Sequence, residues 1–170
     1  ITRPWAVDCF DDFRKSLHGA KPICDRAARS EQGADDFFVA SFVPRYRKAL
    51  FFCDNSGADF VLGMIPFARE LLKHGTDVCL VANSLPAIND ITAGEMQDVV
   101  LRAAKQCETL ARSLRNVDNQ QLDRGEGRVG KLSMCASGSG SPCLDFRRIS
   151  YDLCEAARDA ALIVLEGMGR

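Results

Sequence analysis

Four short apolar segments recur along the chain, and longer segments with helical spacing lie between them. The apolar segments cover residues 49–53, 77–82, 131–136 and 161–165. They lack the strict alternation of a half-exposed strand, which is typical of strands buried on both faces of a sheet. Because strands that alternate with helices form parallel sheets, the pattern predicts an α/β fold.

The first expected helix covers residues 59–74, where large apolar side chains recur at helical spacing. Pro66 should kink this helix or mark an irregular turn, because proline disrupts the interior of a helix. Gly75 is a natural stop, since glycine adopts the left-handed conformation that often ends helices.

Two more helices are expected further along the chain. Thr92 and Glu95 match a capping box, which predicts one long helix from there to about residue 114. Ser150 can cap a last helix over residues 151–159. The expected architecture is therefore a three-layer Rossmann-like parallel sheet with helices on both faces.

A chain of 170 residues is long enough for one domain with a substantial apolar core. We expect residues 1–48 to form an N-terminal helical and loop segment, with helix at residues 1–18. Residues 49–170 should form the α/β core. Within it, residues 116–130 are polar and lack a periodic apolar face, so they are expected to be an exposed connection.

The charge balance of the chain and the shortness of its apolar stretches exclude several classes of partner. The chain has 22 basic and 23 acidic residues and no basic stripe, so no nucleic-acid partner is expected. No apolar stretch is long enough to span a membrane, and no signal-peptide pattern is present, so no membrane association is expected. We expect a cytoplasmic protein that can form a homo-oligomer.

The eight cysteines form no C-x-x-C pair, which argues against a zinc knuckle or a thioredoxin-like site. Cys53, Cys79 and Cys135 lie in the expected strands, and Cys154 lies on an expected helix. We therefore expect reduced, mostly buried cysteines that act as small core residues.

Polar residues follow the first apolar segment directly, in the order Asp54, Asn55, Ser56 and Gly57. Open α/β sheets bind their ligands at the carboxyl ends of the strands, which is where these residues should lie. Asp54 and Asn55 offer hard oxygen ligands, and Gly57 lets backbone approach closely, which suits a divalent metal ion and a phosphate. The same four residues also form a common turn sequence, so this segment alone leaves both interpretations open.

The other three expected strands also end in polar loops, at residues 83–90, 137–142 and 166–170. Parallel strands place all of these loops at one edge of the sheet, beside Asp54. Asp90 would supply a third oxygen ligand, and an all-oxygen set favours magnesium or manganese over zinc. The loop at residues 137–141 can present backbone N–H groups to a phosphate, and it can equally be a flexible linker.

Three motifs in these loops carry a family resemblance. They are CDNSGAD at residues 53–59 with PFARELL at 66–72, NSLPAINDIT at 83–92, and EGMGR at 166–170. The first two resemble the metal-dependent damage-control phosphatase family. The third resembles the signature of a eukaryotic subfamily found behind pantothenate kinase domains and alone in plants. Residues 3–5 resemble the entry segment of that subfamily.

The resemblance implies a metal-dependent phosphatase of small phosphomonoesters, with 4′-phosphopantetheine or its oxidised or damaged forms as the expected substrate. It places Asp54, Asn55 and Asp90 on the positions that hold the divalent ion, which would be Mn, Mg, Ni or Co. Glu166 and Arg170 complete the expected catalytic set. The expected substrate-binding residues are Ser56, Gly57, Asn89, Ser137, Gly138, Gly167, Met168 and Gly169.

Two chemical mechanisms remain open for such a site. Water can attack phosphorus while Asp54 acts as a metal ligand, or Asp54 can attack directly. Aspartyl-phosphate enzymes of the haloacid-dehalogenase type have a second Asp two residues later, where Ser56 stands, so attack by water is favoured. We expect Glu166 to orient a water or an N–H group, and Arg170 to neutralise charge on the phosphate.

An alternative function is a catalytically silent binding or regulatory module of the same fold. Relative to the family, the later strands and a pocket lysine would follow Arg170, so the chain resembles a fragment truncated at its C-terminus. A dinucleotide-binding oxidoreductase is not favoured, because Gly57 and Gly63 do not form the expected G-x-G-x-x-G pattern.

Overall fold

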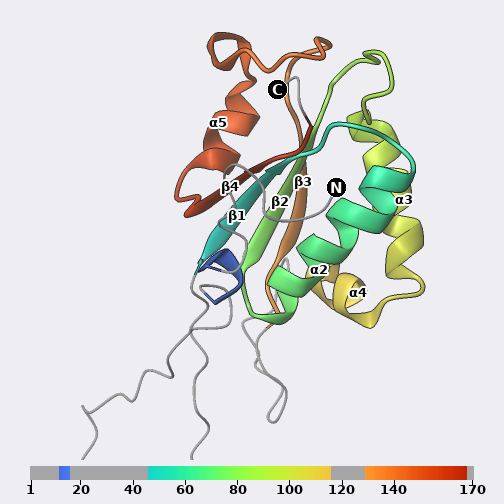
Figure 1. Cartoon of the computed structure of the whole chain (residues 1–170), viewed down its shortest axis with the longest axis vertical. Helices are drawn as coiled ribbons and strands as arrows, with labels where there is room; N and C mark the ends of the chain where they lie inside the picture. The colour runs from blue at the N-terminus through green and yellow to red at the C-terminus, as the bar shows by residue number, and fades with distance from the viewer. Residues whose placement is uncertain (1–11, 16–45, 116–128, 168–170) are drawn as a thin grey trace, which may run out of the picture. The chain divides into compact units, whose positions relative to one another are not determined.

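The computed structural model of the chain describes residues 12–15, 46–115 and 129–167 (Figure 1). From Tyr46 onward these residues belong to one compact unit, Tyr46–Arg170, which begins close to the predicted boundary between residues 48 and 49. Residues 12–15 are helical. The rest of the predicted N-terminal segment lies outside the described residues, as does most of the connection predicted at residues 116–130.

Within the described residues, four strands form one sheet: β1 Lys48–Phe52, β2 Asp77–Ala82, β3 Leu132–Ala136 and β4 Leu162–Leu165. They are all parallel and lie in the order β3-β2-β1-β4, which confirms the predicted α/β sheet. Phe52 of β1 pairs with Val81 of β2 on one side and with Leu165 of β4 on the other. The continuous apolar sequence of β1 fits this central position, where both faces of the strand are covered.

In the part of the chain that the structure describes, four α-helices pack on the sheet: α2 Ile65–Lys73, α3 Ala93–Ala104, α4 Glu108–Arg115 and α5 Tyr151–Ala157. Figure 1 shows α2, α3 and α4 on one face of the sheet and α5 on the other, which confirms the predicted three-layer architecture. Among the described residues, no helix combines the length and apolar character needed to cross a membrane.

The core lies on both sides of β1, because successive side chains of a strand point to opposite faces. Phe51 packs against Phe67 of α2, with ring centroids 5.0 Å apart. On the other face, Leu50 and Phe52 belong to an apolar cluster with Leu153 of α5. Burying one such large side chain contributes about 1.5–3 kcal/mol, so β1 anchors both layers of helices.

In the helical segment after β1, residues 58–59 are followed by a π-helix, η1 Phe60–Met64, which continues as α2. Pro66 lies in the first turn of α2. Its ring would clash with the carbonyl four residues earlier in a regular α-helix, and the wider π-turn just before it relieves this clash. The predicted irregular turn is therefore confirmed. Gly75 follows the helix with φ +79°, which confirms the predicted stop.

The single long helix predicted from Thr92 to about residue 114 is wrong, because a turn separates α3 from α4. In this turn the N–H groups of Lys105 and Gln106 donate to carbonyls three residues earlier, at 3.2 and 3.0 Å. Such bonds tighten the last turn of a helix. The turn lets α4 pack against α2, α3 and β3, and it buries Leu110.

Both predicted helix caps are present. Thr92 Oγ1 accepts from the N–H of Glu95 at 3.3 Å, and Glu95 Oε2 accepts from the N–H of Thr92 at 2.9 Å. Ser150 Oγ accepts from the N–H of Leu153 at 3.1 Å and starts α5, which ends two residues short of the predicted position 159. The sequence signals for helix starts were therefore more reliable than those for helix ends.

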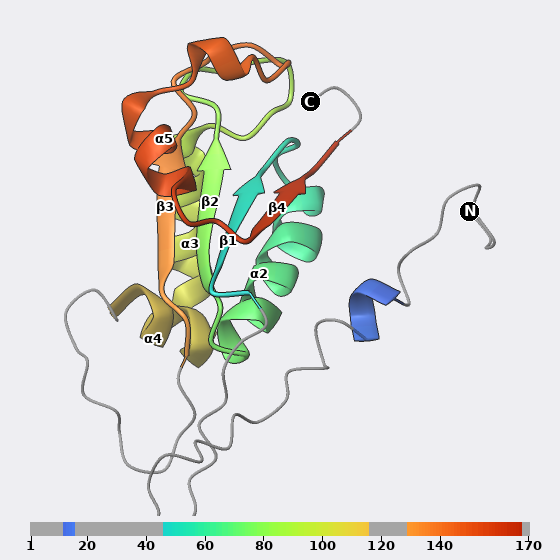
Figure 2. The same ribbon diagram turned by 90° about the vertical axis from the view of Figure 1, so that its left-hand side faces the viewer.

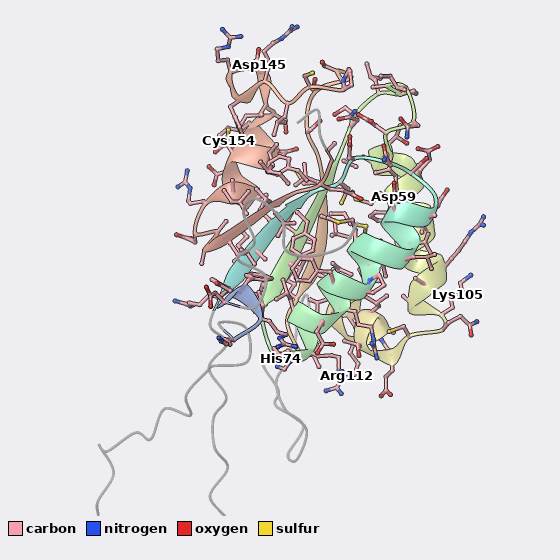
Figure 3. All side chains as sticks on the ribbon, viewed as in Figure 1. Asp59, His74, Lys105, Arg112, Asp145 and Cys154 are labelled. Carbon is pink, nitrogen blue, oxygen red and sulfur yellow. The ribbon has the colours of Figure 1, made fainter. Side chains whose placement is uncertain are left out.

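The expectation of mostly buried cysteines is wrong for the six that the structure describes. Cys53 and Cys79 are buried, while Cys107 and Cys135 are half-buried and Cys143 and Cys154 are exposed. Cys154 lies on α5, whose one fully buried position is its neighbour Leu153 (Figure 3). A short surface helix buries only one stripe of side chains, so the expected core position of Cys154 is not realised. All six are free thiols.

Candidate active site

The loops after β1, β2 and β3 leave the sheet at its carboxyl edge (Figure 2). The arrows of β1, β2 and β4 point toward this edge, and the loops after β2 and β3 extend beyond it. The polar loops therefore converge as predicted. Of the fourth loop, Glu166 and Gly167 are described. Met168, Gly169 and Arg170 lie outside the described residues, and their roles stay predictions.

The loops after β1 and β2 are joined by direct backbone pairing. The N–H of Ser56 donates to the carbonyl of Asn89 at 2.9 Å, and the N–H of Ile91 donates to that of Asp54 at 2.7 Å. Between these two bonds, Asn55 and Asp90 lie opposite each other in an antiparallel bridge. The three predicted metal ligands thus occupy neighbouring backbone positions, although Asp90 lies more than thirty residues after Asp54 and Asn55 in the sequence.

A buried asparagine supports one of these ligands. The Nδ2 of Asn83, a residue that is 1% exposed, donates to Oδ2 of Asp90 at 2.8 Å. The backbone of Asn83 accepts from Ala93 at 2.8 Å and donates to Ile91 at 3.2 Å, so this residue also fixes the start of α3. Asn83 was not among the predicted site residues. The sequence feature that could have identified it is an asparagine directly after the apolar residues of a predicted strand.

The side chain of Asn55 is bonded at both ends of its amide. Its Nδ2 donates to Oδ2 of Asp59 at 2.8 Å, and its Oδ1 accepts from Nδ2 of Asn89 at 2.8 Å. Asn55 is half-buried, and its two partners are exposed. Asn89, predicted to bind substrate, therefore contacts a predicted ligand directly. Asp59 was missed as a site residue, although its spacing of four from Asn55 on a helix start is readable in the sequence.

The end of β4 holds Asp54 from the other side. The N–H of Asp54 donates to Oε2 of Glu166 at 3.0 Å, which is the N–H contact expected for Glu166. Gly167 has φ +90°, and a Cβ atom at this position would overlap with the carboxylate of Asp54. The absence of a side chain at Gly167 thus leaves room for the Asp54 carboxylate, a role different from the predicted contact with substrate.

The glycine- and serine-rich loop after β3 is folded on itself. Ser137 is 1% exposed, and its N–H donates to the carbonyl of Ala82 at 2.9 Å. The N–H of Gly138 donates to Ser84 Oγ at 2.8 Å. Later N–H groups bond to the serine hydroxyl two residues before them. Since these donors are occupied, the structure does not support the predicted phosphate contacts of Ser137 and Gly138.

A strained turn carries Asp90 to the edge of the sheet. The N–H of Asp90 donates to the carbonyl of Ala87 at 2.9 Å, and Ile88 between them has φ +51°. This conformation is unfavourable for a β-branched residue, and the Ile88 side chain is 89% exposed, so packing does not compensate for it. Backbone pairing of Asn89 and Asp90 with the neighbouring loop stabilises the turn.

The start of the helical segment after Gly57 adds hydrogen-bond donors to the same edge. The first helical bond runs from the N–H of Val61 to the carbonyl of Gly57 at 3.0 Å, so the N–H groups of residues 58–60 precede it. No side-chain hydrogen bond from Asp59 caps this helix start. The first N–H groups of a helix have no acceptor within the helix, and such groups attract anions such as phosphate.

The residue types at this edge are ones that could hold a divalent metal ion. The segments that meet here carry the carboxylates of Asp54, Asp59, Asp90 and Glu166. Among the described residues, no three His, Cys, Asp or Glu side chains form a group that could hold a metal by themselves. The predicted set has two carboxylates and an amide oxygen, which leaves positions for water or phosphate, as magnesium sites usually do.

Fold and loops together define a class: an α/β protein whose polar, oxygen-rich loops meet at the carboxyl edge of its parallel sheet, where proteins of this fold bind their ligands. The chain belongs to the damage-control phosphatase ARMT1-like domain family, whose model matches residues 1–170. This confirms the family that the three sequence motifs predicted.

Several relatives are similar over most or all of the chain. "Pantothenate kinase 2" of Arabidopsis thaliana is 43% identical over 178 residues, covering 100% of this chain and 18% of that protein. "Damage-control phosphatase At2g17340" of the same plant is 34% identical over 171 residues, covering 100% of this chain and 36% of that protein. "4'-phosphopantetheine phosphatase" of Mus musculus is 34% identical over 143 residues, covering 84% of this chain and 13% of that protein.

The chain therefore spans between 13% and 36% of the length of these three relatives. Among solved structures, it is similar to a DUF89 family protein (ph1575) from Pyrococcus horikoshii, with a TM-score of 0.45 and 18% sequence identity. That similarity covers 74% of this chain and 34% of the archaeal one.

Proposed function

We propose that this domain is the metal-binding part of a metal-dependent phosphatase that hydrolyses small phosphomonoesters. The observation that carries the proposal is the backbone bridge between Asn55 and Asp90, which brings the expected ligands together with Asp54 at one edge. Membership in a damage-control phosphatase family supports the same reaction class. The name of one relative, 4'-phosphopantetheine phosphatase, supports 4′-phosphopantetheine as the substrate, and the name of another, a damage-control phosphatase, supports its oxidised or damaged forms.

Asp54, Asn55 and Asp90 would hold the divalent ion, which we propose to be Mn, Mg, Ni or Co. When bound, such an ion supplies a Lewis acid for a phosphoryl oxygen. The Nδ2 of Asn83 donates to Oδ2 of Asp90, which orients this carboxylate at the edge where the ion would bind. Outer-shell hydrogen bonds of this kind orient metal ligands and strengthen binding.

The remaining residues would orient the substrate phosphate. The N–H groups at residues 58–60 offer donors at a helix start, where an anion is favoured. Arg170 would contact the phosphate from its other side, which stays a prediction because Arg170 is outside the described residues. Asp54 acts as a ligand rather than a nucleophile in this proposal, since Ser56 stands where aspartyl-phosphate enzymes of the haloacid-dehalogenase type have a second Asp.

The test combines binding and turnover. Isothermal titration calorimetry should show that the chain binds Mn²⁺, and phosphate release from 4′-phosphopantetheine should require that ion. Asp90→Asn should abolish both signals, because an amide replaces a charged ligand. Asp98→Asn is the matched control, since Asp98 is exposed in the middle of α3, and it should leave both signals unchanged.

Two outcomes would contradict the proposal. If the folded chain binds no Mn²⁺, Mg²⁺, Ni²⁺ or Co²⁺, the metal site is wrong. If it binds the ion and 4′-phosphopantetheine but releases no phosphate from any phosphomonoester tested, the catalytic part is wrong. The second result would favour the silent binding or regulatory module.

A further inference from the structure

Asn55 is an unusual metal ligand because an amide has two chemically different ends. The oxygen can bind a cation, whereas the NH₂ group carries hydrogens and cannot. A rotation of about 180° about the last side-chain bond exchanges the amide oxygen and the NH₂ group and leaves the shape of the side chain nearly unchanged. A site that uses Asn55 therefore needs something that determines which end faces the ion.

Asp59 and Asn89 determine the orientation of this amide. An ionised carboxylate only accepts hydrogen bonds, so the contact between Asp59 Oδ2 and the Asn55 amide at 2.8 Å must involve Nδ2. At the other end, Nδ2 of Asn89 donates to Oδ1 of Asn55 at 2.8 Å. A flipped amide would place oxygen against the carboxylate and NH₂ against NH₂, so both hydrogen bonds would be lost.

The bond to Asp59 is the stronger constraint of the two. A hydrogen bond to a charged group contributes more to stability than a hydrogen bond between two neutral groups. The carbonyl-type oxygen of Asn55 has a second lone pair, so it can accept from Asn89 and still face a cation. The carboxylate of Asp59 is not used as a helix cap.

Local structure places Asp59 where this contact is possible. Asp59 has helical backbone angles, φ −63° and ψ −45°, at the beginning of the segment that continues into η1. It lies four residues after Asn55, and its side chain is at the carboxyl edge of the sheet (Figure 3). The contact therefore links the loop after β1 to the helix that follows it.

We infer that Asp59 is a positioning residue that fixes the Asn55 amide with its oxygen toward the metal site. The inference rests on the proposed function, in which Asn55 is a ligand. Asp59 acts through Asn55 and does not touch the ion in this assignment. Two other roles would use the same carboxylate differently: a direct ligand, or a negative charge that attracts the cation from a distance.

Two substitutions separate these roles. Asp59→Ala removes the acceptor, so Mn²⁺ affinity measured by calorimetry should fall by about 10–100-fold, the usual loss when an outer-shell partner is removed. Asp59→Asn keeps an acceptor oxygen without charge, so it should restore affinity to within a few-fold of the natural chain. Asp98→Ala serves as the control for removing an exposed helical carboxylate. Equal losses in Asp59→Ala and Asp59→Asn would assign the effect to charge or direct ligation and overturn the inference, as would no loss in either.

A second measurement does not depend on the metal. In ¹⁵N-resolved NMR spectra of the metal-free chain, the two Asn55 Nδ2 protons should have widely separated shifts, because one is bonded to a carboxylate. Asp59→Ala should bring these shifts together, and Asp98→Ala should not. If the natural chain shows the separated shifts but binds no metal, the orientation holds and the proposed function fails. If it binds Mn²⁺ and Asp59→Ala leaves the Asn55 signals unchanged, the inference fails and the proposed function stands.

Discussion

The backbone N–H of Asp54 donates a hydrogen bond to Oε2 of Glu166 at 3.0 Å, which ties the end of β1 to the end of β4. The N–H of Glu166 in turn donates to the carbonyl of Phe52 at 3.0 Å, so the two chain segments are bonded in both directions. Asp54 is therefore held by the last described segment of the chain as well as by its own strand.

Replacing Glu166 should weaken both the fold and the site. Glu166→Ala removes the acceptor of a charged hydrogen bond, a loss of about 1.5–3 kcal/mol in general, with the lower end expected because Glu166 is half-exposed. Urea unfolding should show this as a lower midpoint. Glu166→Gln keeps an oxygen acceptor and should lose less than half as much. Equal stability of the Glu166→Ala variant and the natural chain would show that the contact contributes nothing.

Gly167 should tolerate no side chain, in contrast to a glycine in the π-helix. Gly167→Ala places a Cβ atom on the Asp54 carboxylate at φ +90°, so the free energy of unfolding should fall by more than about 1 kcal/mol. Mn²⁺ affinity should fall with it, because Asp54 is displaced. Gly63→Ala is the matched control: Gly63 has open space around it, and alanine should stabilise the helix by about 0.5–1 kcal/mol. A Gly167→Ala variant with unchanged unfolding and metal binding would contradict the assigned role.

The cap of α3 should make stability depend on pH. Hydrogen bonds from the backbone and side chain of Thr92 lower the pKa of Glu95 from its ordinary value of 4.5. A lowered carboxyl pKa contributes stability above the ordinary pKa and loses it as pH falls through the folded pKa. The natural chain should therefore be more stable than Glu95→Ala at neutral pH, and the difference should shrink on acidification below 4.5. Thermal unfolding at several pH values measures this, and a difference that does not change with pH would contradict it.

Cys135 should react slowly although it is only half-buried. Burial raises its pKa to about 11, and the neighbouring Cys79 and Asp152 add to the rise. The thiolate is the reactive form, so iodoacetamide at pH near 8 should modify the exposed Cys143 well before Cys135. Labelling of Cys135 should accelerate only as pH approaches 11. Peptide mass spectrometry separates the two sites, and comparable rates at pH near 8 would contradict the raised pKa.

The sequence by itself determined the strands, the parallel sheet and the loops that carry the chemistry. The run from Ala49 to Cys53 has no polar position, and only a strand covered on both faces accommodates such a run. The caps at Thr92 and Ser150 were equally readable, because they depend on hydrogen bonds within three residues. Local signals of this kind need no knowledge of the rest of the fold.

Only the tertiary structure decided where helices turn and which side chains meet. The break before α4 follows from packing against α2 and β3, which no pattern within residues 92–114 contains. The roles of Asn83, Asp59 and Gly167 depend on contacts with other chain segments or on side-chain orientation. In the loop after β3, the N–H groups of Ser137 and Gly138 are occupied by Ala82 and Ser84, which lie in another segment. Such contacts arise when the parallel sheet brings distant loops to one edge. Spacing along the chain therefore predicts which loops meet at that edge, but it does not predict the hydrogen bonds that they form there.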